Sequence, residues 1–163
     1  MTTVNELRAA LALPPITQIG MATRDTRATA QYYQDRLGVG PFTVYDFLAD
    51  KAWYHEQPSL YRSLQGKAML GGIELELMQP VEGPSPARDM LAAHGEGIQH
   101  LGFHVPDYEA YFSRFLAAGF KPVFRIESYV KTYDGIVRAC CFDTDAVGGV
   151  TLEIIWRSWT VGK

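Results

Sequence analysis

The chain has 163 residues, of which 47% are hydrophobic and 20% charged, and this favours a globular protein with a buried core, built as one domain or two fused modules. The formal net charge of −3 provides no basic surface, so a nucleic-acid partner is not expected. No apolar run approaches the roughly 18 residues of a membrane helix, and the amino terminus lacks the pattern of a signal peptide.

Residues 1–16 are expected to form an extension with a short helix before Pro14 and Pro15. The stretch 17–38 predicts a strand, then a helix capped by Asp25 that ends at Gly38. Two more strands are expected near 42–48 and 60–69, followed by a strand over 71–78. A Pro/Gly-rich connection comes next, with a short helix near 86–93.

The second half of the chain repeats the first. The segment 99–120, "QHLGFHVPDYEAYFSRFLAAGF", matches 17–38 in pattern, and "GGVTLEII" (148–155) matches "GGIELELM" (71–78). The middle strands of this second unit are expected near 122–130 and 136–142, with a turn at 133–135. A stripe on the second helix is expected to pack in the core, and it consists of Tyr108, Tyr111, Phe112, Phe115 and Leu116.

The two cysteines, Cys140 and Cys141, are adjacent on a predicted strand. Neighbours on a strand point to opposite faces, and a disulfide between them would be strained. Two free thiols in a reducing compartment are therefore expected, which indicates a cytoplasmic protein.

The repeat places four polar residues at equivalent strand positions. Gln18 corresponds to His100 on the first strand of each unit, and Glu76 corresponds to Glu153 on the last. Two pseudo-symmetric curved sheets would point all four at a common centre. One amide oxygen, one imidazole and two carboxylates suit one divalent metal ion, namely zinc, nickel, cobalt, manganese or iron. Taken singly, each residue would be structural, and Glu74 is the competitor for the place of Glu76.

At these residues the chain resembles a known superfamily. The strings "ITQIGMATRDTRATAQYYQDRLGVGPF", "IELELMQP", "EGIQHLGFHVPD" and "GGVTLEII" are similar to those of the vicinal oxygen chelate superfamily. That superfamily includes glyoxalase I, methylmalonyl-CoA epimerase, extradiol dioxygenases and bleomycin-resistance proteins. The resemblance implies an α+β fold in which two tandem βαβββ modules form a cupped mixed sheet with the helices outside and a divalent metal in the cup.

This resemblance divides the chain into five segments within one domain. They are an N-terminal extension (1–16), a first βαβββ module (17–80), a linker (81–97), a second βαβββ module (98–157) and a C-terminal tail (158–163).

The chain resembles two branches of the superfamily, each through different residues. The "LGVGPF" turn and "ELMQP" followed by "GIQHLGFHV" look like methylmalonyl-CoA epimerases, which usually have histidine at the place of Gln18. A catalytic acid that this branch carries on its third strand has no clear counterpart in "SLYRSLQG" (59–66). The set Gln18, Glu76, His100 and Glu153 instead looks like the ligand set of some glyoxalase I enzymes, although no glutathione-binding signature is recognisable.

The predicted activity is a metal-dependent lyase, isomerase or epimerase reaction that enolises a carbonyl-containing small molecule. A metal that holds the carbonyl oxygen lowers the barrier to removal of the neighbouring proton. Glu153 is the predicted base and Glu76 its partner of opposite hand. The alternatives are a non-catalytic, drug-sequestering binding protein and a ring-cleaving dioxygenase. The dioxygenase needs two histidines and a carboxylate around iron, whereas Gln18 leaves one histidine.

Substrate contacts are expected from Trp53, Tyr61 and Phe142, which could equally be core or dimer contacts. His104 shares a strand face with His100 and either contacts the substrate or is structural, and Gly102 between them leaves room for a ligand. The expected partners are a small-molecule carbonyl substrate and a possible homodimer, because dimers are common in the superfamily. No nucleic acid and no membrane is expected as a partner.

Overall fold

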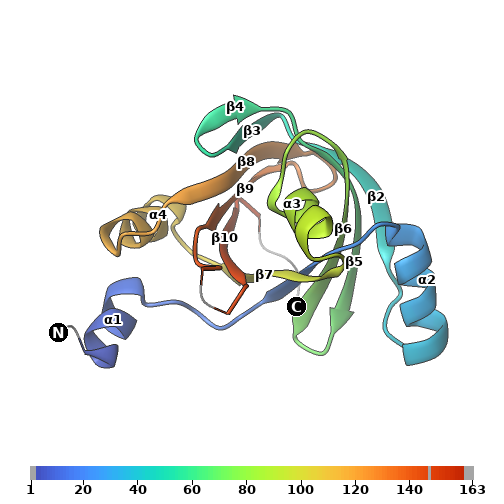
Figure 1. Cartoon of the computed structure of the whole chain (residues 1–163), viewed down its shortest axis with the longest axis horizontal. Coiled ribbons are helices and arrows are strands. Elements are labelled where there is room, and N and C mark those ends of the chain that lie inside the picture. Colours follow the sequence, from blue (N-terminus) through green and yellow to red (C-terminus); the bar gives the residue numbers. More distant parts are fainter. Residues whose placement is uncertain (1–2, 147, 160–163) are drawn as a thin grey trace.

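Ten strands form one continuous mixed sheet that curls into a half-barrel, as a computed structural model of residues 3–146 and 148–159 shows (Figure 1). In chain order the elements are α1 (Val4–Leu11), β1 (Gln18–Ala22), α2 (Thr26–Leu37), β2 (Thr43–Leu48), β3 (Lys51–Tyr54), β4 (Gln57–Ser59), β5 (Arg62–Leu70), β6 (Ile73–Glu82), α3 (Pro86–Ala93), β7 (Gly97–His104), α4 (Tyr108–Ala117), β8 (Pro122–Val130), β9 (Gly135–Phe142) and β10 (Thr151–Arg157). The predicted fold class is confirmed. Residues 1–2 of the predicted extension and 160–163 of the predicted tail lie outside the described residues.

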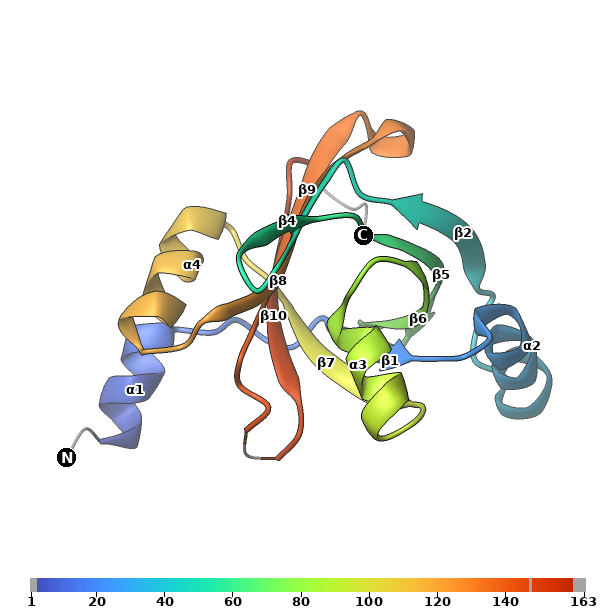
Figure 2. The same ribbon diagram turned by 45° about the horizontal axis from the view of Figure 1, so that its top comes forward.

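The sheet has an internal pseudo-symmetry that follows the sequence repeat. Its order is β2-β5-β6-β1-β7-β10-β9-β8-β3-β4. The two first strands, β1 and β7, pair antiparallel at the centre, and each pairs on its other side with the last strand of its own unit, β6 or β10, in parallel. Because β1 and β7 are the innermost pair, the two halves curve around one common concave face, which Figure 2 shows from a second side.

The hairpin β3–β4 was not predicted from the sequence. It leaves the first unit and pairs with β8 at the far edge of the second unit, with Trp53 opposite Arg125. Its two turn residues, His55 and Glu56, have φ of 47° and 63°, a left-handed conformation that glycine and asparagine favour. Since the turn carries neither residue type, its sequence gives no hairpin signal.

Corresponding helices begin with the same cap. Asp25 accepts a hydrogen bond from the backbone N–H of Ala28 (2.9 Å), and Asp107 accepts one from Ala110 (3.0 Å). Each aspartate satisfies a backbone donor that has no partner inside the helix. The predicted helix start at Asp25 and the helix end at Gly38 are thereby confirmed.

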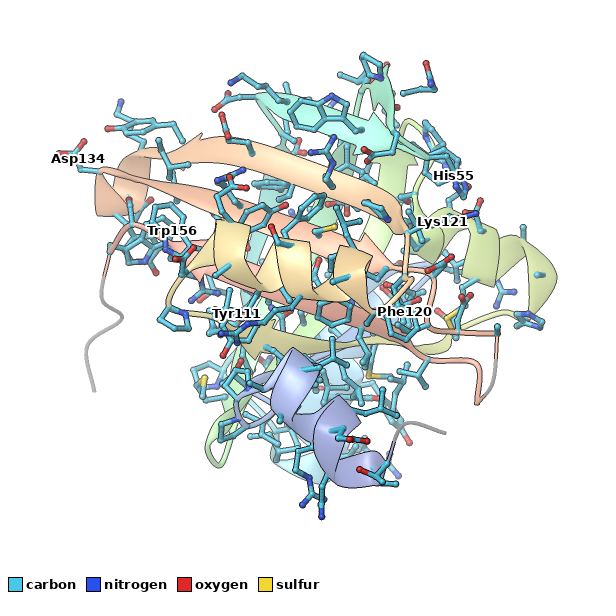
Figure 3. All side chains as sticks on the ribbon, turned by 90° about the vertical axis from the view of Figure 1, so that its left-hand side faces the viewer. His55, Tyr111, Phe120, Lys121, Asp134 and Trp156 are labelled. Atoms are coloured by element: carbon cyan, nitrogen blue, oxygen red, sulfur yellow. The ribbon has the colours of Figure 1, made fainter. Side chains whose placement is uncertain are left out.

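The main core lies behind the second half of the sheet, under α4. Phe115 is fully buried and stacks on Phe142, with the ring centroids 4.1 Å apart. Tyr111 joins α4 to the extension, because its hydroxyl donates to the backbone oxygen of Ala12 (2.9 Å; Figure 3). The predicted aromatic stripe therefore packs as expected except at Leu116, which is 45% exposed.

Both cysteines are free thiols, as predicted, and both are buried. Cys140 belongs to the core under α4, whereas Cys141 lines the concave face of the sheet. Over the described ranges, no helix has the length and apolar character that crossing a membrane requires.

Candidate metal centre

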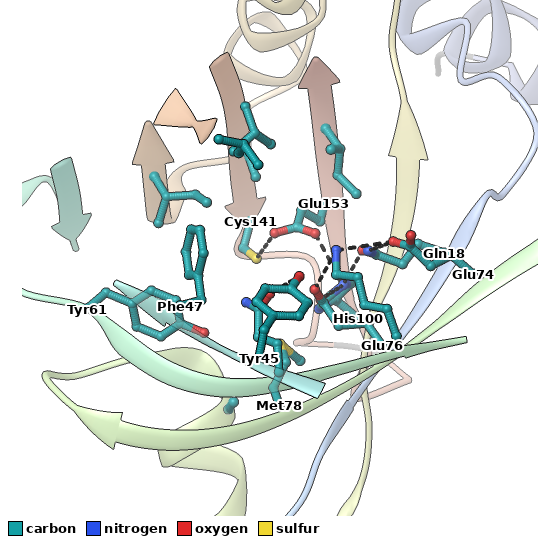
Figure 4. Close-up of a pocket in the computed structure, with 18 of the residues that line it drawn as sticks. Gln18, Tyr45, Phe47, Tyr61, Glu74, Glu76, Met78, His100, Cys141 and Glu153 are labelled. Atoms are coloured by element: carbon teal, nitrogen blue, oxygen red, sulfur yellow. Dashed lines mark hydrogen bonds and ion pairs between the residues drawn. The ribbon is translucent and has the colours of Figure 1, made fainter. Parts of the chain in front are cut away.

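The concave face of the sheet encloses a cavity of about 550 Å³. The four polar side chains singled out from the repeat all line it, each from a different strand: Gln18 from β1, Glu76 from β6, His100 from β7 and Glu153 from β10. Figure 4 shows these side chains grouped at one side of the cavity.

Their polar atoms converge on one nitrogen. His100 Nε2 lies 2.9 Å from Gln18 Oε1, 3.2 Å from Glu153 Oε2 and 3.7 Å from Glu76 Oε2. All four residues are at least nine-tenths buried. We call this group the tetrad, meaning Gln18, Glu76, His100 and Glu153.

Two glycines of the repeat make room for the tetrad. Gly20 stands opposite His100 across the β1–β7 pair, and a Cβ added there would lie 2.0 Å from His100 Cε1. Gly102 stands opposite Gln18, where an added Cβ would lie 2.9 Å from Gln18 Cβ. Each central strand thus leaves space for the polar side chain of the other. The space at Gly102, predicted to admit a ligand, is filled by Gln18 instead.

A β-bulge turns Gln99 toward the cavity beside His100. In the pairing of β1 with β7, Gly20 faces His100 and Met21 faces Ile98, so Gln99 is the extra residue. Gln99 Oε1 lies 2.9 Å from His100 Nδ1, and its amide nitrogen donates to Thr151 Oγ1 (3.1 Å). Because that amide is held by Thr151, its oxygen accepts from Nδ1–H, which leaves Nε2 as the ring nitrogen that faces the rest of the tetrad.

Glu74 fixes the amide of Gln18 in the same way. Gln18 Nε2 donates to Glu74 Oε1 (2.7 Å), so the amide oxygen is the atom that points at His100 Nε2. Glu74 also pairs with Lys67 Nζ (3.2 Å) and Arg157 Nη2 (3.4 Å). Burial alone would raise the pKa of Glu74, but these two cations and the Gln18 amide lower it to about 2. Glu74 is therefore a carboxylate that orients a member of the tetrad.

Lys67 bridges Glu74 to the tetrad from β5. Its Nζ also lies 3.0 Å from Glu76 Oε1, while the other oxygen of Glu76 faces His100. Burial opposes the charged ammonium, but the carboxylates of Glu76 and Glu74 raise the pKa of Lys67 above its ordinary value. The lysine is therefore charged and neutralises part of the acidic cluster.

Glu153 is a buried carboxyl in the cavity wall. Burial raises the pKa of its carboxyl above the ordinary value; His100 opposes this rise and Glu76 adds to it. Its Oε1 lies 3.5 Å from Cys141 Sγ, a weak thiol donor. Glu153 thus holds a proton more readily than an ordinary glutamate does.

The tetrad fits a divalent cation in its donor types. With both amides fixed, the oxygens of Gln18, Glu76 and Glu153 all face His100 Nε2, and a cation shared by these four atoms would replace the proton that otherwise lies between them. Oxygen and nitrogen ligands about 2.0–2.2 Å from one ion lie roughly 3 Å apart, which is close to the separations here. Among the described residues, no group of three or more His, Cys, Asp or Glu side chains is placed so that it could hold a metal ion as it stands. The imidazole and the carboxylates are in direct contact and would have to separate slightly to admit one.

The other predicted site residues are not all at the cavity. Tyr61 lines it, whereas Trp53 lies outside the lining, under the guanidinium of Arg125, 4.8 Å from the ring centroid. Phe142 is fully buried in the core under α4, so it too lies away from the lining. His104 lies off the cavity, where its Nδ1 is 2.8 Å from Thr17 Oγ1 and its buried Nε2 has no hydrogen-bond partner among the described residues.

Sequence reasoning missed Gln99 and Lys67. Strict alternation sends Gln99 to the face opposite His100, and only the bulge reverses this. Lys67 stands opposite Glu76 on the neighbouring strand, but the pairing of β5 with β6 has to be known before the two can be connected. A lysine inside a predicted strand of mostly apolar and small residues ("LQGKAML") was the available signal.

Comparisons with known proteins identify the family. The model of the Glyoxalase/Bleomycin resistance protein/Dioxygenase superfamily matches residues 17–139, and the chain belongs to this superfamily. This confirms the resemblance inferred from the repeat. No curated protein matches the sequence.

Solved structures share the fold at low sequence identity. A variant of methylmalonyl-CoA epimerase from Streptomyces coelicolor, in complex with 2-nitronate-propionyl-CoA, is 22% identical with a TM-score of 0.61, over 90% of this chain and 99% of that one. A hypothetical protein from Bacillus halodurans is 16% identical with a TM-score of 0.62, over 91% and 98%. A mutant of 4-hydroxymandelate synthase from Streptomyces coelicolor is 16% identical with a TM-score of 0.63, over 93% of this chain and 50% of that one. Epimerases and a synthase thus share this architecture.

Proposed function

We propose that the chain is a divalent-metal-dependent lyase, isomerase or epimerase that enolises a carbonyl-containing small molecule. The observation that supports this is the convergence of Gln18 Oε1, Glu76 Oε2 and Glu153 Oε2 on His100 Nε2 inside a cavity. Zinc, nickel, cobalt, manganese and ferrous iron all accept this mixture of oxygen and nitrogen donors. Such an ion, held by the tetrad, would polarise the substrate carbonyl as a Lewis acid.

In this proposal Glu153 is the base that takes the proton next to the carbonyl. Its raised pKa brings the carboxyl closer to neutral pH, where a general base is most effective. Glu76 is the partner on the opposite strand that would deliver a proton from the other side. Lys67, 3.0 Å from Glu76 Oε1, offsets the negative charge that builds up during enolisation.

A binding protein without catalysis is the second candidate, and the charge balance favours it. Glu74 and Glu76 are matched by Lys67 and Arg157, and burial favours the protonated form of Glu153, so the acidic cluster is largely neutralised without a metal. The dioxygenase alternative is weaker, because His104, which would have to supply a second histidine, lies off the cavity.

The direct test is exchange of the proton next to the carbonyl with solvent deuterium, followed by NMR. The metal-reconstituted protein is offered propiophenone, a methylmalonyl thioester and the glutathione hemithioacetal of methylglyoxal. We expect exchange above background with at least one of them, abolished in Glu153→Gln and kept in Glu82→Gln, a matched change at an exposed position of β6. Tight metal binding with no exchange on any of the three would favour the binding protein. Full exchange in Glu153→Gln would refute the assigned base.

The cytoplasmic location and the homodimer remain proposals. The free, buried thiols support a reducing compartment. Size-exclusion chromatography with light scattering measures the oligomeric state, and a mass of one chain at all concentrations would contradict the dimer.

A further inference from the structure

The cavity has two chemically different sides. The tetrad, Lys67 and Glu74 occupy one side, at strands β1, β5, β6, β7 and β10. Apolar side chains form the other, and we call the following six the apolar wall: Phe47, Tyr61, Phe124, Ile126, Val137 and Ile155. Figure 4 shows the rings of Phe47 and Tyr61 across the cavity from the acidic cluster.

The apolar wall is fixed before any ligand binds. Tyr61 and Phe124 are 4% and 7% exposed, and their rings meet edge to face with the centroids 4.8 Å apart. The ring of Phe47 packs against that of Tyr61, with the two centroids 6.2 Å apart. The contact joins β8 of the second unit to the segment before β5 of the first, so the wall is held where the two ends of the curved sheet approach each other. Edge-to-face packing of this kind is energetically favourable.

The cations of the cavity are already paired. Of the described residues that line it, Lys67 and Arg157 are the only lysine or arginine, and both pair with Glu74. A ligand that carries a phosphate or carboxylate group into the cavity would have to break these ion pairs to find a cation. An uncharged group against the apolar wall has no such cost and gains from leaving water.

From these observations, and resting on the proposed function, we propose that the part of the substrate that enters the cavity is an uncharged aromatic or alicyclic group joined to the enolisable carbonyl. The carbonyl faces the tetrad and the ring lies against Tyr61, Phe124 and Ile126. A volume of about 550 Å³ is within the usual range for small-molecule sites.

The test compares two 1,3-diketones that differ only in a ring. Acetylacetone and benzoylacetone carry the same chelating unit, but benzoylacetone has a phenyl group where acetylacetone has a methyl group. Their dissociation constants are measured by calorimetry on protein treated with EDTA and on protein reloaded with zinc. Because the phenyl group buries more apolar area, benzoylacetone should bind about tenfold tighter or more in both forms.

Variants of the apolar wall locate the preference. Ile126→Ala should reduce the ratio of the two affinities about threefold or more, and Phe124→Ala should reduce it further if it folds. Leu48→Ala, at a side chain that is 57% exposed outside the cavity, should leave the ratio unchanged. Equal affinities for the two diketones, or a ratio that Ile126→Ala does not change, would overturn the inference.

Failure of the proposed function gives a different result. Without a metal site, benzoylacetone still binds more tightly than acetylacetone to EDTA-treated protein. Zinc then raises the affinity for neither diketone, and no deuterium exchange occurs. That outcome supports the aromatic site and refutes the enolising metal. A preference for an anionic probe such as malonate over both diketones would refute the substrate class alone.

Discussion

Replacing Gly20 with alanine should drive the imidazole of His100 out of the tetrad. The new Cβ would lie 2.0 Å from His100 Cε1 and 2.4 Å from both ring nitrogens, whereas ordinary contact begins at 3.4 Å, so the ring must retreat by about 1.4 Å. Overpacking of this kind costs about 1–3 kcal/mol, and loss of the hydrogen bond between Nδ1 and Gln99 adds about 1 kcal/mol. We therefore expect unfolding free energy to fall by about 2–4 kcal/mol.

Urea unfolding followed by tryptophan fluorescence measures this loss, and zinc titration measures the metal affinity that should fall with it. Gly72→Ala is the matched control, because an added Cβ there meets nothing within 4 Å and the backbone φ is not positive. That variant should be neutral or more stable by up to about 1 kcal/mol. Wild-type stability together with wild-type zinc affinity in Gly20→Ala would show that the close approach of Gly20 to His100 does not hold the site.

Three further predictions concern residues around the site. Burial and the charge of Arg157 lower the pKa of His104 to about 4, below its value of about 6.5 in the unfolded chain. The unfolded chain therefore binds more protons between these pKa values, so stability should fall by about 2 kcal/mol or less as the pH falls from about 6.5 to about 4, after allowance for partial solvent exposure. His104→Gln should flatten that part of the urea stability profile, and an unchanged slope would show that another group titrates. Gln99→Leu removes the acceptor for His100 Nδ1 and should weaken zinc binding about 10–100-fold in calorimetry; an unchanged affinity would mean that the imidazole needs no such anchor. Because burial raises the pKa of both Cys140 and Cys141, neither thiol should react rapidly with Ellman's reagent at pH 8 until urea is added, and fast reaction of the native protein would contradict their burial.

The sequence was informative where local pattern and duplication coincide. Asp25 and Asp107 are capping residues at matching positions, and the Gln18–Ile19–Gly20 and His100–Leu101–Gly102 triplets place a polar residue and a glycine on one face. In the sheet these triplets run antiparallel, so each polar residue lies opposite the other triplet's glycine. The four side chains of the tetrad come together because the two units are related by this symmetry. No single residue predicts this on its own.

Features that depend on register or on the partner strand could not be read in the same way. The bulge at Gln99 adds one residue to β7, and no composition signal marks it. The hairpin β3–β4 turns on His55 and Glu56 rather than on glycine, and it pairs with a strand about 70 residues away. The aromatic residues show the same limit, because Tyr61 reaches the cavity while Phe142 packs on the other side of the sheet.

The most direct test of the metal centre is the metal content of the protein after purification and reconstitution, measured by plasma mass spectrometry. Wild type is compared with Glu76→Gln/Glu153→Gln, and with Glu82→Gln/Glu127→Gln as a matched pair of changes outside the cavity. We expect about one divalent ion per chain in wild type and in the matched pair, with little in the tetrad variant. Equal metal in all three proteins, or none in wild type after reconstitution with zinc, nickel, cobalt, manganese and ferrous iron, would contradict it.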